Sequence, residues 1–398
     1  MNIKKFDFGI NNYLEDRPKL KKYLPQALTL FAIIFVLGYF TYNAQVNMGN
    51  RGIVFGFGFL TQESSFDIQF SLIDYDGSYS YGRAYLVGLL NTILVSVIGI
   101  FFATLLGVIV GISRLSSNYL VSKFAETYVE IFRNIPLLLQ IFFWYFAALR
   151  ALPLPQDAIN LFDVTYLTVK GWFVPRLVWT NLSFFIGSLV LAIVAIIFIN
   201  IFAKKKQEAT GKRIPAFFIS LGLIIILPLL TFLFGGVKLD FEYPKLIQQA
   251  PTIFNFSGGV GIIPELIALA LALSLYTATF IAECVRAGIM GVGKGQKEAA
   301  ASIGLTPNQT LRLVVMPQAL RIIIPPTTNQ YLNLTKNSSL AAAIAYPDLV
   351  LVFAGTAMMQ TGRAIEIVSI TMLTYLTLSI LISLFMNWYN KKIAIKEK

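Results

Sequence analysis

The sequence contains no histidine and only one cysteine, and 13% of its 398 residues are charged. Without an imidazole, the chain cannot build a histidine-ligated metal site, a Ser-His-Asp triad or a histidine acid–base step. Cys284 cannot form a disulfide within the chain, and a small packed side chain is its expected role in an apolar run. The sequence shows no nucleophile–base pair and no metal-ligand cluster, so we expect neither a catalytic site nor a metal site.

The sequence is instead rich in long apolar segments, and hydrophobic residues make up 56% of it. Four uncharged runs each exceed the roughly 20 residues that a helix needs to cross a bilayer: 84–113, 182–203, 214–237 and 367–390. Two shorter runs have uncharged or interfacial flanks, and two further segments are apolar with polar interruptions: 28–42, 266–282, 122–148 and 321–345. Together they predict an all-α integral membrane protein with about eight transmembrane helices.

The formal net charge of +12 raises the question of nucleic-acid binding, which the charge distribution argues against. If the chain starts inside, its inside segments hold about 22 of the 32 lysines and arginines, as the positive-inside rule expects. Residues 28–42 follow a basic head without a signal-peptidase site, so we expect a retained anchor. The basic charge is therefore expected to set the orientation of the chain in the membrane, with both termini cytoplasmic. We expect membrane lipid around the protein and no nucleic-acid partner.

Residues 298–317 predict two short helices joined by a rigid turn. Gly304 suits the left-handed residue that ends a helix, and the apolar Leu305 follows it. Residues 306–309 read Thr-Pro-Asn-Gln, with an N-cap, a proline at the first helical position and the glutamine of a capping box. Pro317 is expected to stop the second helix from running on unbroken. A first helix of about eight residues is unstable alone, so it either docks into a partner or belongs to an ordinary hairpin.

The same stretch resembles the EAA loop of ABC-importer permeases, where Glu-Ala-Ala is followed by three residues, Gly, nine residues and Ile-x-Leu-Pro. Here Glu298, Ala299 and Ala300 are followed at that spacing by Gly304 and by Val-Val-Met-Pro, which ends at Pro317. Valine and methionine are mild departures from this pattern. The flanks resemble the polar amino-acid branch of the family: Tyr-Thr-Ala at 276–278, Gly-Gln at 295–296, Pro-Gln-Ala-Leu-Arg at 317–321 and Lys-Asn-Ser-Ser-Leu at 336–340.

This resemblance implies a type I ABC-importer permease fold and the membrane subunit of an ATP-driven importer in the bacterial inner membrane. Such a subunit moves amino acids from periplasm to cytoplasm, and the longer chain is similar to the general L-amino-acid branch. The implied partners are an ABC ATPase subunit dimer, a second and different permease subunit, and a periplasmic amino-acid-binding protein. An ion-coupled secondary amino-acid transporter that acts without an ATPase is the alternative, because a broken helix also fits that class.

We expect no cofactor on this chain, with ATP and magnesium bound by the partner ATPase. Gly288, Gly293 and Lys294 have the spacing of a phosphate-binding loop. However, Gly295 stands where serine or threonine is required, and an apolar helix precedes the stretch where a strand should be. The sequence therefore predicts no nucleotide site here.

The resemblance also suggests how the chain is divided. We expect a cytoplasmic head at 1–27, a first transmembrane helix with a periplasmic loop at 28–83, the permease domain at 84–390 and a cytoplasmic tail at 391–398. The EAA coupling loop then occupies 291–320. Segment 150–264 does not match the compact family core and resembles the insertion of two extra helices in longer permeases.

Ionisable and polar residues at membrane depth are costly, so they are candidates for a substrate pathway. Residues 133–140 resemble the Arg-Gly-Thr-Pro-Leu-Leu run of amino-acid permeases, and they supply Arg133 and Gln140 as candidates. The alternative is a structural Glu130–Arg133 pair. Tyr276 and Glu283 lie seven residues apart on one helical face, with gating, substrate contact or simple solvation as possible roles.

A polar break interrupts the crossing predicted over 321–345. Lys336, Asn337 and Ser338 stand between apolar residues, and Tyr346-Pro347-Asp348 is expected to restart a second short helix. Non-helical backbone at membrane depth is tolerated only inside protein or beside a cavity, and such breaks offer donors to an anionic ligand. The three residues are therefore candidate donors to an amino-acid carboxylate, unless the break is a boundary loop nearer the surface.

Small residues recur at every fourth position of the run 84–113: Gly99, Ala103, Gly107 and Gly111. Such a stripe leaves one smooth helix face that another helix can approach closely. We expect it to pack inside the bundle.

Overall fold

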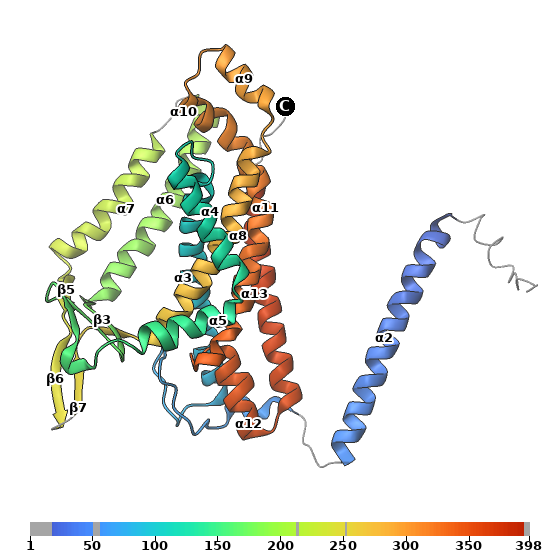
Figure 1. Cartoon of the computed structure of the whole chain (residues 1–398), viewed down its shortest axis with the longest axis vertical. Coiled ribbons are helices and arrows are strands. Elements are labelled where there is room, and N and C mark those ends of the chain that lie inside the picture. Colours follow the sequence, from blue (N-terminus) through green and yellow to red (C-terminus); the bar gives the residue numbers. More distant parts are fainter. Residues whose placement is uncertain (1–17, 51–55, 212–214, 251–252, 394–398) are drawn as a thin grey trace, which may run out of the picture.

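The computed structural model describes residues 18–50, 56–211, 215–250 and 253–393. Within these ranges the chain forms a helical bundle with short strands near its lower end (Figure 1). Six of the described helices are long and apolar enough to cross a membrane: α2 (Pro18–Asn50), α3 (Tyr81–Ser113), α6 (Leu182–Thr210), α7 (Ala216–Leu233), α8 (Pro264–Met290) and α13 (Ala364–Ile393). The predicted helical membrane fold is confirmed.

Two further segments account for the remaining predicted crossings. Helix α4 (Tyr119–Asn134) and the pair α5 (Leu137–Phe142) and η2 (Phe143–Leu149) form one apolar unit that is bent by 102°, which gives a seventh span if counted once. Helix α11 (Met316–Asn337) packs against α8 and α13, but it contains several polar residues and, beyond its first turn, two prolines. Its 22 residues reach about 33 Å at 1.5 Å per residue, which is long enough to cross.

The centre of the bundle is the close contact between α3 and α8. The small-residue stripe of α3 is buried in this contact, as predicted. A Cβ placed on Gly107 would lie 2.6 Å from Ile281 Cβ, and one on Gly111 would lie 2.7 Å from the carbonyl oxygen of Ala282. Only glycine allows these backbones to approach so closely, so the two helices form one rigid unit.

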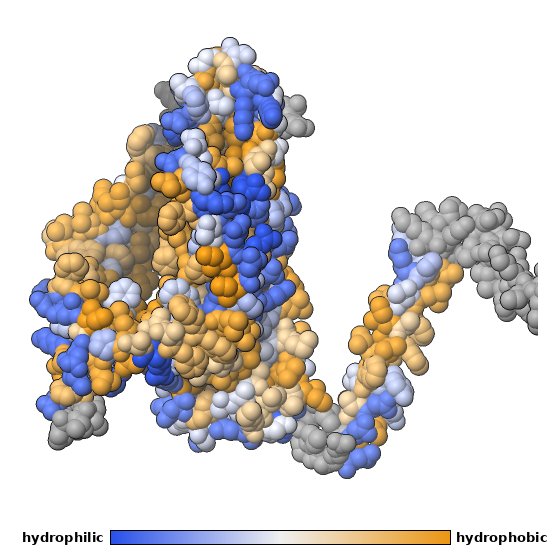
Figure 2. All heavy atoms as spheres, in the orientation of Figure 1, coloured by the Kyte–Doolittle hydropathy of each residue, from blue (hydrophilic) through white to orange (hydrophobic). Residues whose placement is uncertain are grey.

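Helix α2 stands apart from the bundle (Figure 1), and apolar side chains cover much of its length (Figure 2). Its hydrophobic window has no buried residue, so lipid or another chain must cover it in a membrane. The predicted cytoplasmic head lies largely outside the described residues, since the description begins at Pro18. The predicted tail likewise lies largely outside them.

The segment predicted as an insertion contains the two expected helices, α6 and α7, which pack against each other. It also contains short antiparallel strands that the sequence analysis did not anticipate. A four-stranded sheet has the order β1-β2-β3-β8. Two two-stranded sheets pair β4 with β5, across α6 and α7, and β6 with β7. The strands are β1 (Ile159–Leu161), β2 (Thr165–Thr168), β3 (Gly171–Val174), β4 (Arg176–Thr180), β5 (Lys238–Glu242), β6 (Lys245–Ala250), β7 (Ile253–Ser257) and β8 (Val260–Ile262).

The opposite end of the bundle carries the stretch that resembles an EAA loop. Helix α9 (Lys294–Ser302) follows α8 after three residues, and α10 (Pro307–Thr310) leads through the π-helix η4 (Leu311–Val315) into α11. Figure 1 shows α9 and α10 at the top, away from α12 (Met358–Thr361) at the bottom. The remaining short helices are η1 (Phe57–Thr61), η3 (Pro155–Asp157), η5 (Ser338–Ile344) and η6 (Val350–Ala357).

Candidate functional site

Helices α9 and α10 form a rigid hairpin, which we call the EAA hairpin (Lys294 to Thr310). The first helix ends in the predicted glycine cap. Gly304 has a φ of +80°. Its N–H donates to the carbonyl of Ala301 at 2.9 Å, and the N–H of Leu305 donates to the carbonyl of Ala300 at 3.1 Å. These are the two hydrogen bonds of a Schellman motif, which satisfies the last carbonyls of a helix.

The second helix of the hairpin begins with the predicted capping box. The Gln309 N–H donates to Thr306 Oγ1 at 3.4 Å, and the Thr306 N–H donates to Gln309 Oε1 at 2.9 Å. Pro307 occupies the start of the helix, where its missing N–H costs nothing. Both sides of the turn are therefore fixed by local hydrogen bonds, and little flexibility remains between α9 and α10.

One face of the EAA hairpin has no partner within the described chain. Ala300 is buried, whereas Glu298 and Ala299 are exposed. Glu298 makes no ion pair with any residue that the structure describes. Ile303 is 76% exposed at the tip, although isoleucine is usually buried in soluble regions. Sequence analysis did not select Ile303, because its position outside the Glu-Ala-Ala motif gave no signal.

The prediction that Pro317 interrupts the second helix is wrong. The chain stays helical from α10 to the end of α11, and Pro317 lies in the first turn of α11 directly after η4. A proline in a regular α-helix clashes with the carbonyl four residues earlier. The wider π-helical turn just before Pro317 changes that spacing, so the proline is accommodated without a break.

Gln140 lies at the sharp bend between α4 and α5, and it has a clear structural role. Its Nε2 donates to the carbonyls of Phe132 at 2.8 Å and Ile135 at 2.9 Å. The carbonyl of Phe132 would ordinarily accept from the residue four positions on, but that residue is Pro136, which has no N–H. The buried amide of Gln140 thus replaces a missing backbone donor.

We expect Gln140→Leu to destabilise the protein by about 1–3 kcal/mol for each buried carbonyl left without a partner. The free energy of unfolding or the thermal midpoint in detergent measures this. The matched control is Gln207→Leu, since Gln207 is exposed on α6 and makes no described side-chain hydrogen bond. Equal stability of the two variants would show that the amide of Gln140 is not needed at the bend.

Arg133, the other candidate on this segment, lies in a different environment from Gln140. Arg133 is exposed, and its guanidinium lies over the ring of Phe280 on α8 at 5.4 Å. The alternative Glu130–Arg133 pair is not among the described ion pairs. The ion pair within this helix joins Lys123 to Glu126 at 2.8 Å.

The face predicted on α8 is divided between two environments. The Tyr276 ring packs edge-on against Phe280 at 5.0 Å and is half-buried. Thr279, which lies between Tyr276 and Glu283 in the sequence, is fully buried, and its hydroxyl donates to the carbonyl of Tyr276. Glu283 is half-buried and forms ion pairs with Arg114 and Arg286. Its carboxylate already has two cationic partners, so solvation alone does not describe it.

The predicted break in the last part of the bundle is present. Helix α11 ends at Asn337, a 3-10 helix follows, and Ala345 adopts a left-handed φ of 59° before η6 begins. The three candidates do not gather at one point. Lys336 is exposed and Asn337 is half-buried. Ser338 is fully buried, where its hydroxyl donates to the carbonyl of Thr335 at 2.7 Å.

Sequence analysis missed the polar contacts that hold this break against α3. The Asn91 Nδ2 donates to the carbonyl of Pro347 at 2.8 Å, and the Leu349 N–H donates to Thr92 Oγ1 at 3.0 Å. Asp348 Oδ1 accepts from the N–H of Leu351 at 2.8 Å, so Asp348 caps the restarted helix. Two signals in the sequence could have indicated these contacts: Asp348 stands directly before an apolar run, and the polar pair Asn91-Thr92 lies inside the apolar run 84–113.

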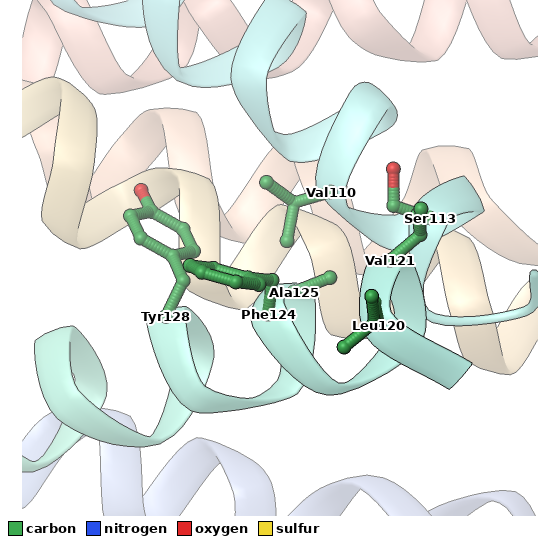
Figure 3. Close-up of a pocket in the computed structure, with 7 residues that line it drawn as sticks. All are labelled: Val110, Ser113, Leu120, Val121, Phe124, Ala125 and Tyr128. Atoms are coloured by element: carbon green, nitrogen blue, oxygen red, sulfur yellow. The ribbon is translucent and has the colours of Figure 1, made fainter. Parts of the chain in front are cut away.

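Two of the pockets do not suit a zwitterion. Figure 3 shows an open pocket of about 440 Å³ between α3 and α4, lined by Val110, Ser113, Leu120, Val121, Phe124, Ala125 and Tyr128. A larger pocket of about 580 Å³ is lined by apolar side chains of α3, α8 and the strands, and by Ser274. Neither lining includes a charged residue. An amino acid carries two charges that need polar partners, so these pockets are not its binding site.

The fold and site together define a membrane transport subunit. Several crossing helices surround a polar break, and a rigid hairpin projects from one end with an exposed, unpartnered face. Within the described residues no group of histidine, cysteine, aspartate and glutamate could hold a metal ion. Such a chain has the features of a membrane transport subunit.

Comparison with known proteins identifies the family. Residues 195–395 match the model described as binding-protein-dependent transport system inner membrane component. The chain is 50% identical to the putative amino-acid ABC transporter permease protein YhdX of Escherichia coli (strain K12), over 96% of each chain. It is 49% identical to the general L-amino acid transport system permease protein AapQ of Rhizobium johnstonii, over 96% of this chain and 94% of that one.

A solved amino acid ABC transporter with histidines is 18% identical, with a TM-score of 0.46 over 78% of this chain and 95% of that one. On the sequence matches, the chain belongs to the family of binding-protein-dependent transport system inner membrane components, the permease subunits of ABC importers. The family indicated by the EAA motif is confirmed. The protein is a multi-pass inner-membrane protein, and its family works with an ATPase and a binding protein.

Proposed function

We propose that this permease carries general L-amino acids from periplasm to cytoplasm, driven by ATP hydrolysis on a separate ATPase dimer. The names of its relatives, which describe amino-acid and general L-amino-acid transport, support the choice of cargo. A periplasmic amino-acid-binding protein delivers the substrate, and a second, different permease chain completes the pathway. ATP and magnesium bind to the ATPase, and this chain catalyses no reaction.

The topology proposed for this chain places both termini and the EAA hairpin in the cytoplasm. The permease domain is 84–390, with 150–264 as its insertion and 291–320 as the coupling loop. The head (1–27), the first helix with its loop (28–83) and the tail (391–398) complete the chain. Concentration of basic residues in the segments assigned to the inside supports this orientation.

The observation that carries the proposal is the exposed face of the EAA hairpin. An unpaired Glu298 and a 76% exposed Ile303 lie on a hairpin fixed by two caps. Glu298 pairs across the contact with the ATPase, and the small side chains of Ala299 and Ala300 let backbones approach. Gly304 fixes the angle of the elbow, while Pro317 begins the helix that leads back into the membrane.

The substrate pathway is proposed to use two groups of residues with different roles. Arg133 and Lys336 are exposed cations, and Lys336 makes no ion pair with any described residue, so both suit a substrate carboxylate. The remaining candidates support the pathway by holding helix bends and faces in position: Gln140, Tyr276, Glu283, Asn337 and Ser338.

Reconstitution tests this function. Proteoliposomes with the chain, an ATPase, a second permease and a binding protein are expected to accumulate radiolabelled L-amino acids only when ATP is hydrolysed. Liposomes with this chain alone and an imposed proton or sodium gradient are the comparison. Uptake by the chain alone would contradict the proposal and support ion-coupled transport.

A further inference from the structure

A cluster of three charged side chains joins two helices near the EAA hairpin. Glu283 lies on α8, about two turns before that helix ends at Met290. Its carboxylate forms a short charge-assisted bond with Arg114 Nη1, and its other oxygen accepts from Arg286 Nη2 at 2.5 Å. The side chains are 17% exposed for Arg114 and 31% for Glu283, so water only partly screens this pair.

Arg114 connects this cluster to two more parts of the chain. It is the C-cap residue of α3, with its N–H bonded to the carbonyl of Val110. Its own carbonyl accepts from the hydroxyl of Ser122 on α4 at 3.1 Å. The Arg114–Glu283 bond therefore links α8 to the turn that joins α3 and α4. Arg286, in contrast, lies on the same helix as Glu283 and links nothing else.

The helices around this cluster are packed too closely to slide past one another. A Cβ on Gly111, one turn before Arg114, would lie 2.8 Å from Val285 Cβ. A Cβ on Gly288 would lie 2.3 Å from Ile323 Cγ1 on α11. Interlocked packing of this kind moves as a unit rather than deforming continuously.

The cluster also lies close in sequence to the EAA hairpin. Only residues 291–293 separate the end of α8 from the start of α9. Displacement of α9 therefore reaches the last turns of α8, which carry Glu283, as well as α11 through α10 and η4. Because Glu283 already has two guanidinium partners, its carboxylate is poorly suited to receive the ammonium group of a substrate.

We infer that the Arg114–Glu283 pair is a brace that transmits displacement of the EAA hairpin from the α3–α8 unit to the turn that joins α3 and α4, and so to α4. This rests on the proposed function, since it requires an ATPase at the hairpin. Glu283 and Arg114 are positioning residues in this role, and Arg286 is an auxiliary partner. Without the brace, hairpin movement still follows ATP hydrolysis and α3 still moves with α8, but the α3–α4 turn and α4 follow them less closely.

The test compares three variants in the complete reconstituted complex: Arg114→Gln, Arg286→Gln, and the charge swap Arg114→Glu with Glu283→Arg. The swap is made in the Arg286→Gln background, so that the swapped side chain at position 283 does not face the Arg286 guanidinium. The measured quantity is amino-acid molecules accumulated per ATP hydrolysed. Arg114→Gln is expected to lower this ratio by at least about fivefold, the lower end of typical coupling effects, while ATP hydrolysis continues. Arg286→Gln is expected to keep the ratio within about twofold, and the swap to restore at least half of it.

An unchanged ratio in Arg114→Gln would overturn the brace, as would equal losses in Arg114→Gln and Arg286→Gln. If Arg114→Gln does not assemble, the charge swap decides: assembly with restored coupling supports the brace, and assembly without coupling, or failure to assemble, overturns it. The wild-type complex distinguishes the two levels of the proposal. Absence of ATP-driven uptake there contradicts the proposed function, whereas normal wild-type uptake with a fully coupled Arg114→Gln variant contradicts the brace alone.

Discussion

A complex that carries Glu298→Lys is expected to lose amino-acid uptake and permease-stimulated ATP hydrolysis together. The expected loss is at least about 30-fold, the effect of removing one interface residue worth about 2 kcal/mol. Glu298 is exposed on α9 and unpaired within the described chain, so its charge is available to the ATPase. Reversal replaces an attraction by a repulsion at the contact that transmits force.

The control for this prediction is Glu208→Lys. Glu208 is also exposed and lies near the end of α6, outside the EAA hairpin. Its replacement by lysine changes the charge by the same amount. Both variants are expected to insert into the membrane at wild-type levels, and Glu208→Lys is expected to transport normally. Wild-type uptake in the Glu298→Lys complex would contradict the assignment of the hairpin as the coupling element.

Gly107→Leu is expected to prevent stable folding, because α3 and α8 cannot separate without losing the centre of the bundle. A Cβ at this position would already lie 2.6 Å from Ile281 Cβ, and leucine adds three more carbons. Overpacking in a close-packed core costs typically 1–3 kcal/mol and more when backbones must move. Yield after detergent extraction and the thermal midpoint of the purified complex measure the effect.

Gly187→Leu is the matched control for Gly107→Leu. Gly187 also lies in an apolar crossing helix, but a Cβ there meets nothing within 4 Å. Its variant is expected to be as stable as the wild type. Equal yields and midpoints for the two leucine variants would show that the α3–α8 contact is looser than the structure describes.

The features that sequence predicted best are those that depend on local chemistry. The caps of the EAA hairpin are set by residues within five positions of one another, so Gly304 and Thr306 sufficed to predict them. The membrane spans follow from the length and apolarity of single runs. The stripe on α3 predicted a close helix contact, although it could not name α8 as the partner.

The features that sequence could not predict depend on contacts between distant positions. Asn91 bonds to the carbonyl of Pro347, 256 residues away, and nothing local to either residue indicates the other. Gln140 was selected as a pathway residue because it is polar at membrane depth. Its partners are only five and eight residues away, but they lie across a sharp bend whose direction the sequence does not reveal. The strands of the insertion are three to six residues long, too short for a periodic pattern to distinguish them from loops.

The pathway candidates illustrate the same limit. Lys336, Asn337 and Ser338 are consecutive, yet a helix turns each side chain by about 100°, so their environments range from exposed to fully buried. Glu283 was selected from the sequence as an ionisable residue on a helical face with Tyr276. Its partner Arg114 lies 169 residues earlier, and only the fold brings the two charges together.

We propose that the EAA hairpin lies on the cytoplasmic side and is held by the ATPase. The most direct test of this proposal is labelling of Ile303→Cys in a Cys284→Ala background, which removes the single native cysteine. Met359→Cys on α12 is the control for the opposite side, since Met359 is 84% exposed. A membrane-impermeant maleimide is expected to label Ile303→Cys only in inverted vesicles stripped of the ATPase, and Met359→Cys only in intact spheroplasts. Labelling of Ile303→Cys in intact spheroplasts, or unchanged labelling when the ATPase is bound, would contradict the account.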